Sequence, residues 1–203
     1  MEHDPNLYEA ATTVKLEQAV AQQLQSRSYD LQSNKALFKN YLVNASHVKV
    51  DVVCNVLVLG LMRLPNKDFT VLLNLLPVKC IGDASVTAIR ESAALLEKGK
   101  YAEFWEEYVN HESLFNSASG FANSIRLFIL GNLRDSYKAM PKALFAQCVG
   151  VEEESMSVFC QGNKFIEKLT DVHVHFAMDA EEASKSASVA PSSLVKTDEV
   201  ASF

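Results

Sequence analysis

Apolar residues recur at steps of three and four between residues 120 and 140, a pattern that predicts one long amphipathic helix. The residues of this apolar stripe are Phe121, Ile125, Phe128, Ile129, Leu133, Tyr137 and Met140. Leu127 and Leu130 widen the stripe, so we expect the helix to be packed from two directions. Pro141 predicts the end of the helix, because the residue before a proline is disfavoured in the α conformation.

Gly131 lies inside this predicted helix, where a glycine costs about 1 kcal/mol of stability relative to alanine. We interpret it as a position where another backbone approaches closely, because the missing side chain permits such an approach. The helix is expected to join a helical array upstream to a different module downstream.

The apolar pattern before position 120 predicts a row of helices separated by short turns. Their expected ranges are 6–26, 30–43, 47–64, 69–76, 84–98 and 101–110, followed by a loop over 111–119. Asp30 and Asp83 are expected N-caps, and Gly99 is expected just past a helix end. The first helix carries few large apolar residues, so we place it at one end of the stack.

The stretch 47–64 is rich in valine, which favours strands, but its length of about 18 residues favours a buried helix. Short connections make sequential helices antiparallel neighbours. We therefore predict a mostly α fold in which residues 1–140 form a helical-repeat array of HEAT/TPR-like type, ending in the long helix.

The pattern changes after Pro141. Short helices are predicted over 141–149, 152–161 and 164–169, and Gly150 is expected to end the first of them. Alternation of apolar and other residues over 172–178 then predicts a half-buried strand. We expect 141–179 to form a small winged-helix module of PCI-like type. The stretch 180–203 has the Ser-, Ala- and Glu-rich composition of a low-complexity tail.

Composition narrows the class of protein. Hydrophobic residues make up 48% of the chain and charged residues 22%, with a mean hydropathy of +0.01, which are ordinary globular values. The formal net charge is −6, and residues 141–179 hold three basic against six acidic residues. Nucleic-acid binding by the winged helix is therefore the disfavoured alternative. No apolar run long enough for a membrane helix is apparent, and we expect a cytoplasmic protein.

The sequence gives little indication of a catalytic or metal-binding site. The four cysteines, Cys54, Cys80, Cys148 and Cys160, lie among apolar neighbours without a C-x-x-C pair, which predicts buried free thiols. His173 and His175 share one face of the predicted strand, but a metal site needs a third ligand that no spacing supplies.

Other chemistry-bearing groups have equally ordinary explanations. The two glutamates at 106–107 and the three at 152–154 are typical of solvated helix faces and helix starts. The aromatic positions in 101–110 fall at helical spacing, which favours a core role over a binding surface. We therefore predict no enzyme, no cofactor and no metal; an enzyme using Cys or His chemistry is the alternative of a different class.

A partner interface is the more concrete expectation. A strand of alternating residues can pair with a strand of another chain through its edge, which makes His173, Val174, His175 and Phe176 the predicted contact residues. Leu194, Val195 and Val200 give a second, weaker apolar signal, which pairs with this strand or orders against a partner.

Several segments occur in an order that resembles a known family. They are Tyr29-Asp-Leu-Gln-Ser-Asn34 with Leu37 and Tyr41, then Leu64-Pro-Asn-Lys-Asp-Phe-Thr70, Phe104-Trp105 and Gly120-Phe-Ala-Asn-Ser-Ile-Arg126. The set resembles PCI-type scaffold subunits and, among these, the family of subunit k of eukaryotic translation initiation factor 3. The likeness weakens after Pro141, where the chain is shortened around 150–172.

The resemblance implies a non-catalytic subunit of a large assembly that binds the small ribosomal subunit and supports translation initiation. It also implies a direct partner, subunit l, through winged-helix edges set side by side, with subunit e nearby. The family's C-terminal segment joins helices of other subunits, which here corresponds to 194–203. The alternative is a small lid subunit of the proteasome or of the signalosome.

Overall fold

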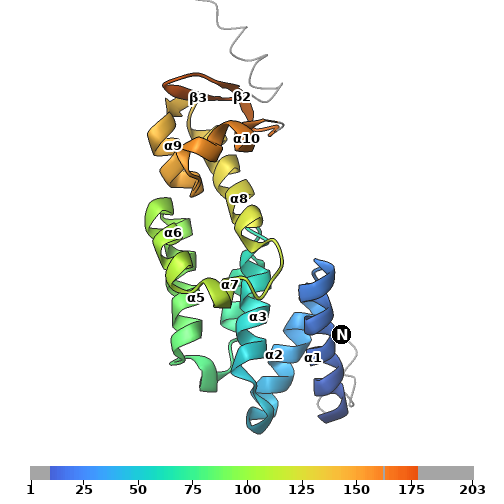
Figure 1. Cartoon of the computed structure of the whole chain (residues 1–203). Helices are drawn as coiled ribbons and strands as arrows, with labels where there is room; N and C mark the ends of the chain where they lie inside the picture. Colours follow the sequence, from blue (N-terminus) through green and yellow to red (C-terminus); the bar gives the residue numbers. More distant parts are fainter. Residues whose placement is uncertain (1–9, 162, 178–203) are drawn as a thin grey trace, which may run out of the picture.

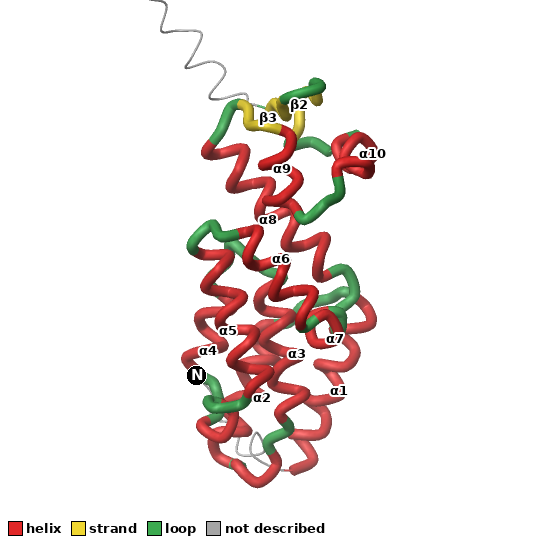
Figure 2. Tube along the Cα trace, turned by 60° about the vertical axis from the view of Figure 1, so that its left-hand side comes forward, coloured by secondary structure: helices red, strands yellow, loops and turns green. Residues whose placement is uncertain are grey.

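The computed structural model describes residues 10–161 and 163–177, in which helices lie along one long axis and a small sheet closes one end (Figures 1 and 2). The helical array comprises α1 (Ala10–Ser26), α2 (Leu31–Val43), η2 (Ala45–His47), α3 (Val50–Leu61), α4 (Asp68–Asn74), η3 (Val78–Cys80), α5 (Ala84–Glu97), α6 (Tyr101–Asn110), α7 (Glu112–Phe115) and α8 (Phe121–Ser136). The elements after it are β1 (Ala139–Pro141), α9 (Lys142–Val149), η4 (Glu153–Ser155), α10 (Met156–Cys160), β2 (Ile166–Leu169) and β3 (His173–Phe176).

This arrangement confirms the predicted fold class, a mostly α array followed by a small winged-helix module. In the described part of the chain, no helix is both long and apolar enough to cross a membrane. The predicted division at residues 140 and 179 stays a prediction.

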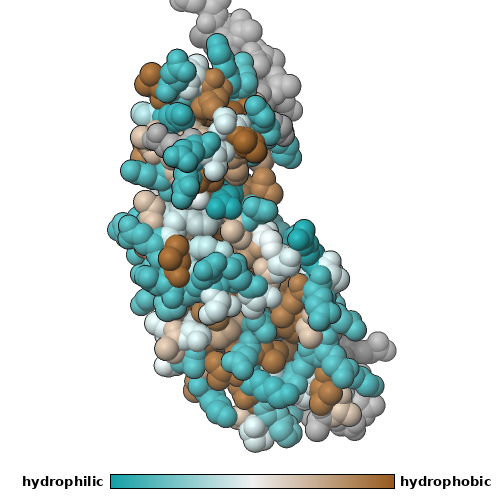
Figure 3. All heavy atoms as spheres, in the orientation of Figure 1, coloured by the Kyte–Doolittle hydropathy of each residue, from teal (hydrophilic) through white to brown (hydrophobic). Residues whose placement is uncertain are grey.

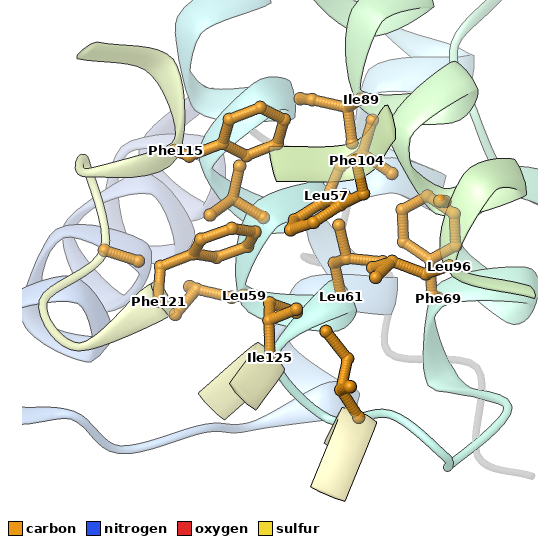
Figure 4. Close-up of a cluster of buried hydrophobic side chains, with 14 of the residues drawn as sticks. Leu57, Leu59, Leu61, Phe69, Ile89, Leu96, Phe104, Phe115, Phe121 and Ile125 are labelled. Atoms are coloured by element: carbon orange, nitrogen blue, oxygen red, sulfur yellow. The ribbon is translucent and has the colours of Figure 1, made fainter. Parts of the chain in front are cut away.

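The centre of the core is α3. Its side chains from Val56 to Leu61 are all buried, as expected for a helix surrounded by others, and it packs against α1, α4 and α5. Leu57 and Leu61 meet residues of α5 and α6 in the cluster of Figure 4. Full burial of such a side chain contributes roughly 1.5–3 kcal/mol, so this cluster is a large part of the stability. The helix is shorter than predicted, because residues 45–47 form a separate 3-10 turn.

Aromatic rings connect helices α6, α7 and α8. Phe115 of α7 lies between Phe104 of α6 and Phe121 of α8, with ring centroids 6.4 Å and 4.9 Å away. Tyr101, Phe104 and Trp105 are buried, so the core interpretation of the aromatic helix is supported. The predicted loop over 111–119 contains the one-turn helix α7, because the buried Phe115 anchors it.

Helix α1 packs on α2 through buried polar groups. The amides of Gln23 and Asn34 exchange hydrogen bonds of 3.0 and 3.1 Å, and the Thr13 hydroxyl donates to Asn40 Oδ1 at 2.8 Å. All four residues are buried. These contacts explain how a helix with few large apolar residues is held against the stack. Asp30 and Asp83 accept the N-cap hydrogen bonds predicted for α2 and α5.

The predicted helix over 120–140 is too long at its C-terminal end. Helix α8 ends at Ser136, and Tyr137 adopts an extended conformation. Residues 139–141 instead pair with β3, since the strand ladder satisfies backbone groups that a last helical turn leaves unpaired. Tyr137 is consequently 51% exposed, whereas Met140 is buried as a residue of strand β1.

Two further expectations about α8 are wrong. Leu130 is buried, but Leu127 is 53% exposed, so no second described element covers that side of the helix. A Cβ atom at Gly131 would meet nothing within 4 Å, so no backbone of the described residues approaches it.

The predicted helix over 164–169 is also wrong, because this segment contains strand β2. It pairs antiparallel with β3, and the sheet order is β1-β3-β2. Thr170 closes the turn between them, because its N–H and its hydroxyl both donate to the His173 carbonyl. A helix of six residues has little stability of its own, and the ladder with β3 outweighs it.

The polar interface between α1 and α2 gives the first prediction. Asn34→Leu should lower the free energy of unfolding by about 1–3 kcal/mol, because it leaves the buried Gln23 Nε2 without its acceptor, while Gln23 Oε1 keeps only the Asp30 N–H. The double variant with Gln23→Leu should recover only part of the loss, since both buried amides are then removed but the Asp30 N–H loses its acceptor on Gln23. Urea unfolding of the three proteins measures this; equal midpoints for the native chain and Asn34→Leu would contradict it.

Candidate partner interface

The predicted contact strand lies in the middle of the sheet. Strand β3 pairs with β1 on one side and with β2 on the other, so it has no free edge. Val174 and Phe176 are 0% and 2% exposed, and the Phe176 ring lies 6.0 Å from that of Phe145 in α9. The expectation that β3 itself offers its edge to a partner is therefore corrected. The alternating pattern predicts a half-buried strand but does not reveal its place in the sheet.

His173 and His175 occupy the other face of β3. His173 is exposed, His175 is half-buried, and their ring centroids are 6.5 Å apart. Among the residues that the structure describes, no group of three His, Cys, Asp or Glu side chains is placed to hold a metal ion. The two histidines thus contribute a polar patch to the surface of the winged helix.

The free edges of the sheet belong to β1 and β2. Strand β1 has three residues and ends in Pro141, which has no backbone N–H to offer. Strand β2 has four residues without proline, and Glu167 and Lys168 on it are exposed. The better edge for pairing is that of β2. The other predicted contact residues, Leu194, Val195 and Val200, lie outside the described residues.

Trp105 and Arg126 fix the winged helix on the array. Trp105 Nε1 donates to the Cys148 carbonyl at 2.9 Å, while Arg126 Nε and Nη2 donate to the Val149 and Gly150 carbonyls at 3.1 and 3.0 Å. We call these contacts the junction clamp. The last carbonyls of a helix have no intrahelical donor, so the clamp satisfies the end of α9 with side chains from α6 and α8.

The packing around the clamp is close. The Arg126 guanidinium lies 5.0 Å from the centroid of the Trp105 ring, a cation–π contact that keeps both side chains in place. Gly150 has a φ of +60°, and a Cβ atom there would lie 2.5 Å from the Trp105 ring. Burial lowers the pKa of Arg126, and its hydrogen bonds to the Val149 and Gly150 carbonyls give the buried guanidinium two acceptors.

A second contact joins α8 to the sheet. The Arg134 guanidinium lies 5.3 Å from the centroid of the Phe165 ring, just before β2. The Phe165 carbonyl accepts a hydrogen bond of 3.0 Å from the Ala177 N–H, which follows β3. Two positions along α8, Arg126 and Arg134, therefore contact the winged helix.

The sequence predicted a core role for Trp105, without its contact to α9, and gave Arg126 no role beyond its place in a family-like segment. The sequence feature nearest to the clamp was Gly150, which was predicted to end a helix. In the structure it ends α9 in a left-handed conformation. The clamp joins residues that are far apart in the sequence: Trp105 and Cys148 are separated by 43 positions, and Arg126 is 23 and 24 positions before Val149 and Gly150. A local sequence pattern cannot reveal such contacts.

The cysteines and acids have the environments of structural groups. Cys54, Cys80 and Cys160 are buried, Cys148 is half-buried, and all four are free thiols. Burial raises the pKa of the Cys54 thiol to about 12 and raises the pKa of the other three, so little thiolate forms near neutral pH. Glu106 is exposed on α6, Glu154 is exposed in η4, and Glu152 is exposed in the loop before η4.

The face of the molecule in Figure 3 is mostly hydrophilic, with several separate hydrophobic patches. Such a surface suits contacts made through local features, such as a strand edge or a groove.

A family model and individual relatives of the chain indicate the same protein family. Residues 47–186 match the model of the CSN8/PSMD8/EIF3K family. Over 140 residues the chain is 30% identical to eukaryotic translation initiation factor 3 subunit K of Drosophila grimshawi, 29% identical to that of Drosophila erecta and 30% identical to that of Drosophila yakuba. Each match covers 69% of this chain and 63% of the relative, so the chain spans less than two thirds of these relatives' length.

The junction clamp gives a prediction. Gly150→Ala should lower the free energy of unfolding by about 2 kcal/mol or more, because it adds both left-handed strain and an overlap with Trp105. Gly99→Ala is the matched control, since Gly99 has the same left-handed backbone, with a φ of +72°, but a Cβ atom there meets nothing within 4 Å. Urea unfolding of both variants measures the difference. Equal losses in the two variants would show that the Gly150–Trp105 contact has no special role.

Proposed function

The chain belongs to the CSN8/PSMD8/EIF3K family, and we propose that it is a non-catalytic scaffold subunit of eukaryotic translation initiation factor 3. The match to subunit K proteins over 140 residues carries this proposal. The matched region 47–186 includes the central helix α3, the clamp and the whole described winged helix. Its role is then to support small-ribosomal-subunit binding and translation initiation from within the cytoplasmic complex.

The mechanism is recognition by surfaces in a fixed arrangement. The clamp holds the winged helix on α8, so the edge of β2 is presented at a set orientation to the array. A partner strand added to β2 gains backbone hydrogen bonds, and the exposed Glu167 and Lys168 add selectivity. We assign this edge to subunit l, with subunit e nearby and no direct contact with DNA. His173 and His175 remain proposed contact residues on the adjacent sheet face.

The second contact is the segment 194–203, including Leu194, Val195 and Val200, which joins helices of other subunits in this proposal. No step of the mechanism requires bond chemistry, a cofactor or a metal. The raised pKa values of the four thiols support this view, because a thiol without thiolate character is a poor nucleophile.

The alternative is a small lid subunit of the proteasome or the signalosome. The matching family model carries the names of all three kinds of subunit, which is the observation that favours keeping this alternative. The same architecture serves each assembly, so the identity of the partners decides between them.

Mass spectrometry of what co-purifies with the tagged full chain from its native cells tests the function. We expect the other subunits of initiation factor 3 in near-equal amounts. Recovery of proteasome lid or signalosome subunits instead would select the alternative, and recovery of the chain alone would refute both readings.

Hydrogen–deuterium exchange tests the assignment of the edge. In the purified complex, amides of residues 166–169 should exchange at least about tenfold more slowly than in the isolated chain, because a partner strand protects them. Residues 139–141 on the opposite edge are the internal control. Unchanged exchange at β2 in an intact complex would remove the edge assignment and leave the complex membership standing.

A further inference from the structure

A groove runs along one side of α8. It consists of two connected hollows of about 250 and 430 Å³, which share Met62, Arg63, Ser124 and Leu127 in their walls. The first hollow lies between the end of α1, the end of α3 and the start of α8. The second continues past the turn after α3 and reaches Phe165 before β2. The groove therefore extends along most of α8.

The wall that α8 contributes has features of a helix-packing surface without a packed helix. Leu127 is 53% exposed, and one turn further Gly131 lines the second hollow. Nothing in the described chain requires a glycine there, because a Cβ atom would meet nothing within 4 Å. A glycine inside a helix nevertheless costs about 1 kcal/mol. A side chain missing at this point lets the axis of a second helix come closer to α8.

The charge of the first hollow is positive. Its lining includes Arg27 and Arg63 and no acidic residue, in a chain whose net charge is −6. Arg27 donates to Ser119 Oγ at 3.1–3.2 Å, and the Arg63 guanidinium lies 5.4 Å from the Tyr29 ring centroid. Neither guanidinium forms an ion pair within the described residues. In the second hollow, Asp135 is already paired with Arg134 at 2.8 Å.

Arg27 has a left-handed backbone with a φ of 53°, just after the end of α1. This conformation costs a non-glycine residue about 1–2 kcal/mol, and glycine is the usual residue at such a helix end. A long cationic side chain is thus present where glycine would be less strained, and it lines the hollow. Strained backbone also occurs at ligand-binding positions, which is consistent with a contact made by Arg27.

We propose that the groove receives an acidic amphipathic helix of a partner subunit. Its small and apolar side chains pack on Leu127 and over Gly131, and its carboxylates pair with Arg27 and Arg63. The inference rests on the proposed function in that the partner is another subunit of the same assembly. Two arginines in a hollow lined by both polar and apolar side chains fit an acidic amphipathic helix better than RNA, which requires a wider basic surface than this acidic chain has.

Photo-crosslinking of the full chain tests this contact. The chain carries benzoylphenylalanine in place of Leu127, is expressed with a tag in its native cells, is irradiated and is then purified. The crosslinked peptide is sequenced by mass spectrometry. We expect an adduct in a net-acidic helical segment of another protein. The double variant Arg27→Glu with Arg63→Glu should reduce its yield at least about tenfold through like-charge repulsion.

Two matched variants separate binding from stability. Arg90→Glu reverses an exposed arginine that lines neither hollow, so the adduct should persist at its full yield. Arg27→Gly suits the left-handed backbone, so it should leave the melting temperature unchanged or raise it while reducing the adduct. A lowered melting temperature with an unchanged adduct would show that Arg27 has only a structural role, and would overturn its part in the contact.

Other outcomes overturn the inference as a whole. These are an adduct to RNA, to a basic segment, or to residues 178–203 of the same chain, and the absence of an adduct from preparations that contain the other subunits. The proteins that co-purify are identified in the same preparations, so failure of the proposed function appears separately as a different set of partners. The sequenced adduct still decides the occupant of the groove in that case.

Discussion

Three backbone carbonyls at the end of α9 are bound by two side chains of the helical array, Trp105 and Arg126. The rest of the architecture depends on this contact, because the end of a helix otherwise leaves these acceptors unpaired. Their donors come from α6 and α8, which the aromatic cluster around Phe115 already holds together. The clamp thereby makes the winged helix part of the same packed body as the array.

A body joined in this way can work as a scaffold. The edge of β2 and the groove along α8 both lie on elements connected to the clamp, so their spacing and direction are set by the fold. Partners bound at fixed positions lose less freedom on assembly than partners bound to a mobile module. In the proposed scaffold role, the same rigidity lets the chain act through the geometry in which it presents its surfaces.

Sequence patterns predicted the features that are decided locally. The caps at Asp30 and Asp83 and the buried character of α3 follow from side-chain chemistry and helical period. The predictions that were wrong concern segments whose conformation depends on contacts with distant parts of the chain. Residues 137–141 and 164–169 were compatible with helices, but β3 offers them a ladder. The position of β3 between two strands, which excludes it as an edge, and the clamp on Gly150 likewise exist only once the chain has folded.

Differential scanning calorimetry tests most directly whether the array and the winged helix form one body. The full chain should unfold in a single transition, with equal calorimetric and van't Hoff enthalpies. Arg126→Ala should split it, with a first transition that unfolds residues 139–177 while the array persists. Two separate transitions in the unmodified chain, or one unchanged transition in Arg126→Ala, would contradict the claim that the clamp unites the two parts.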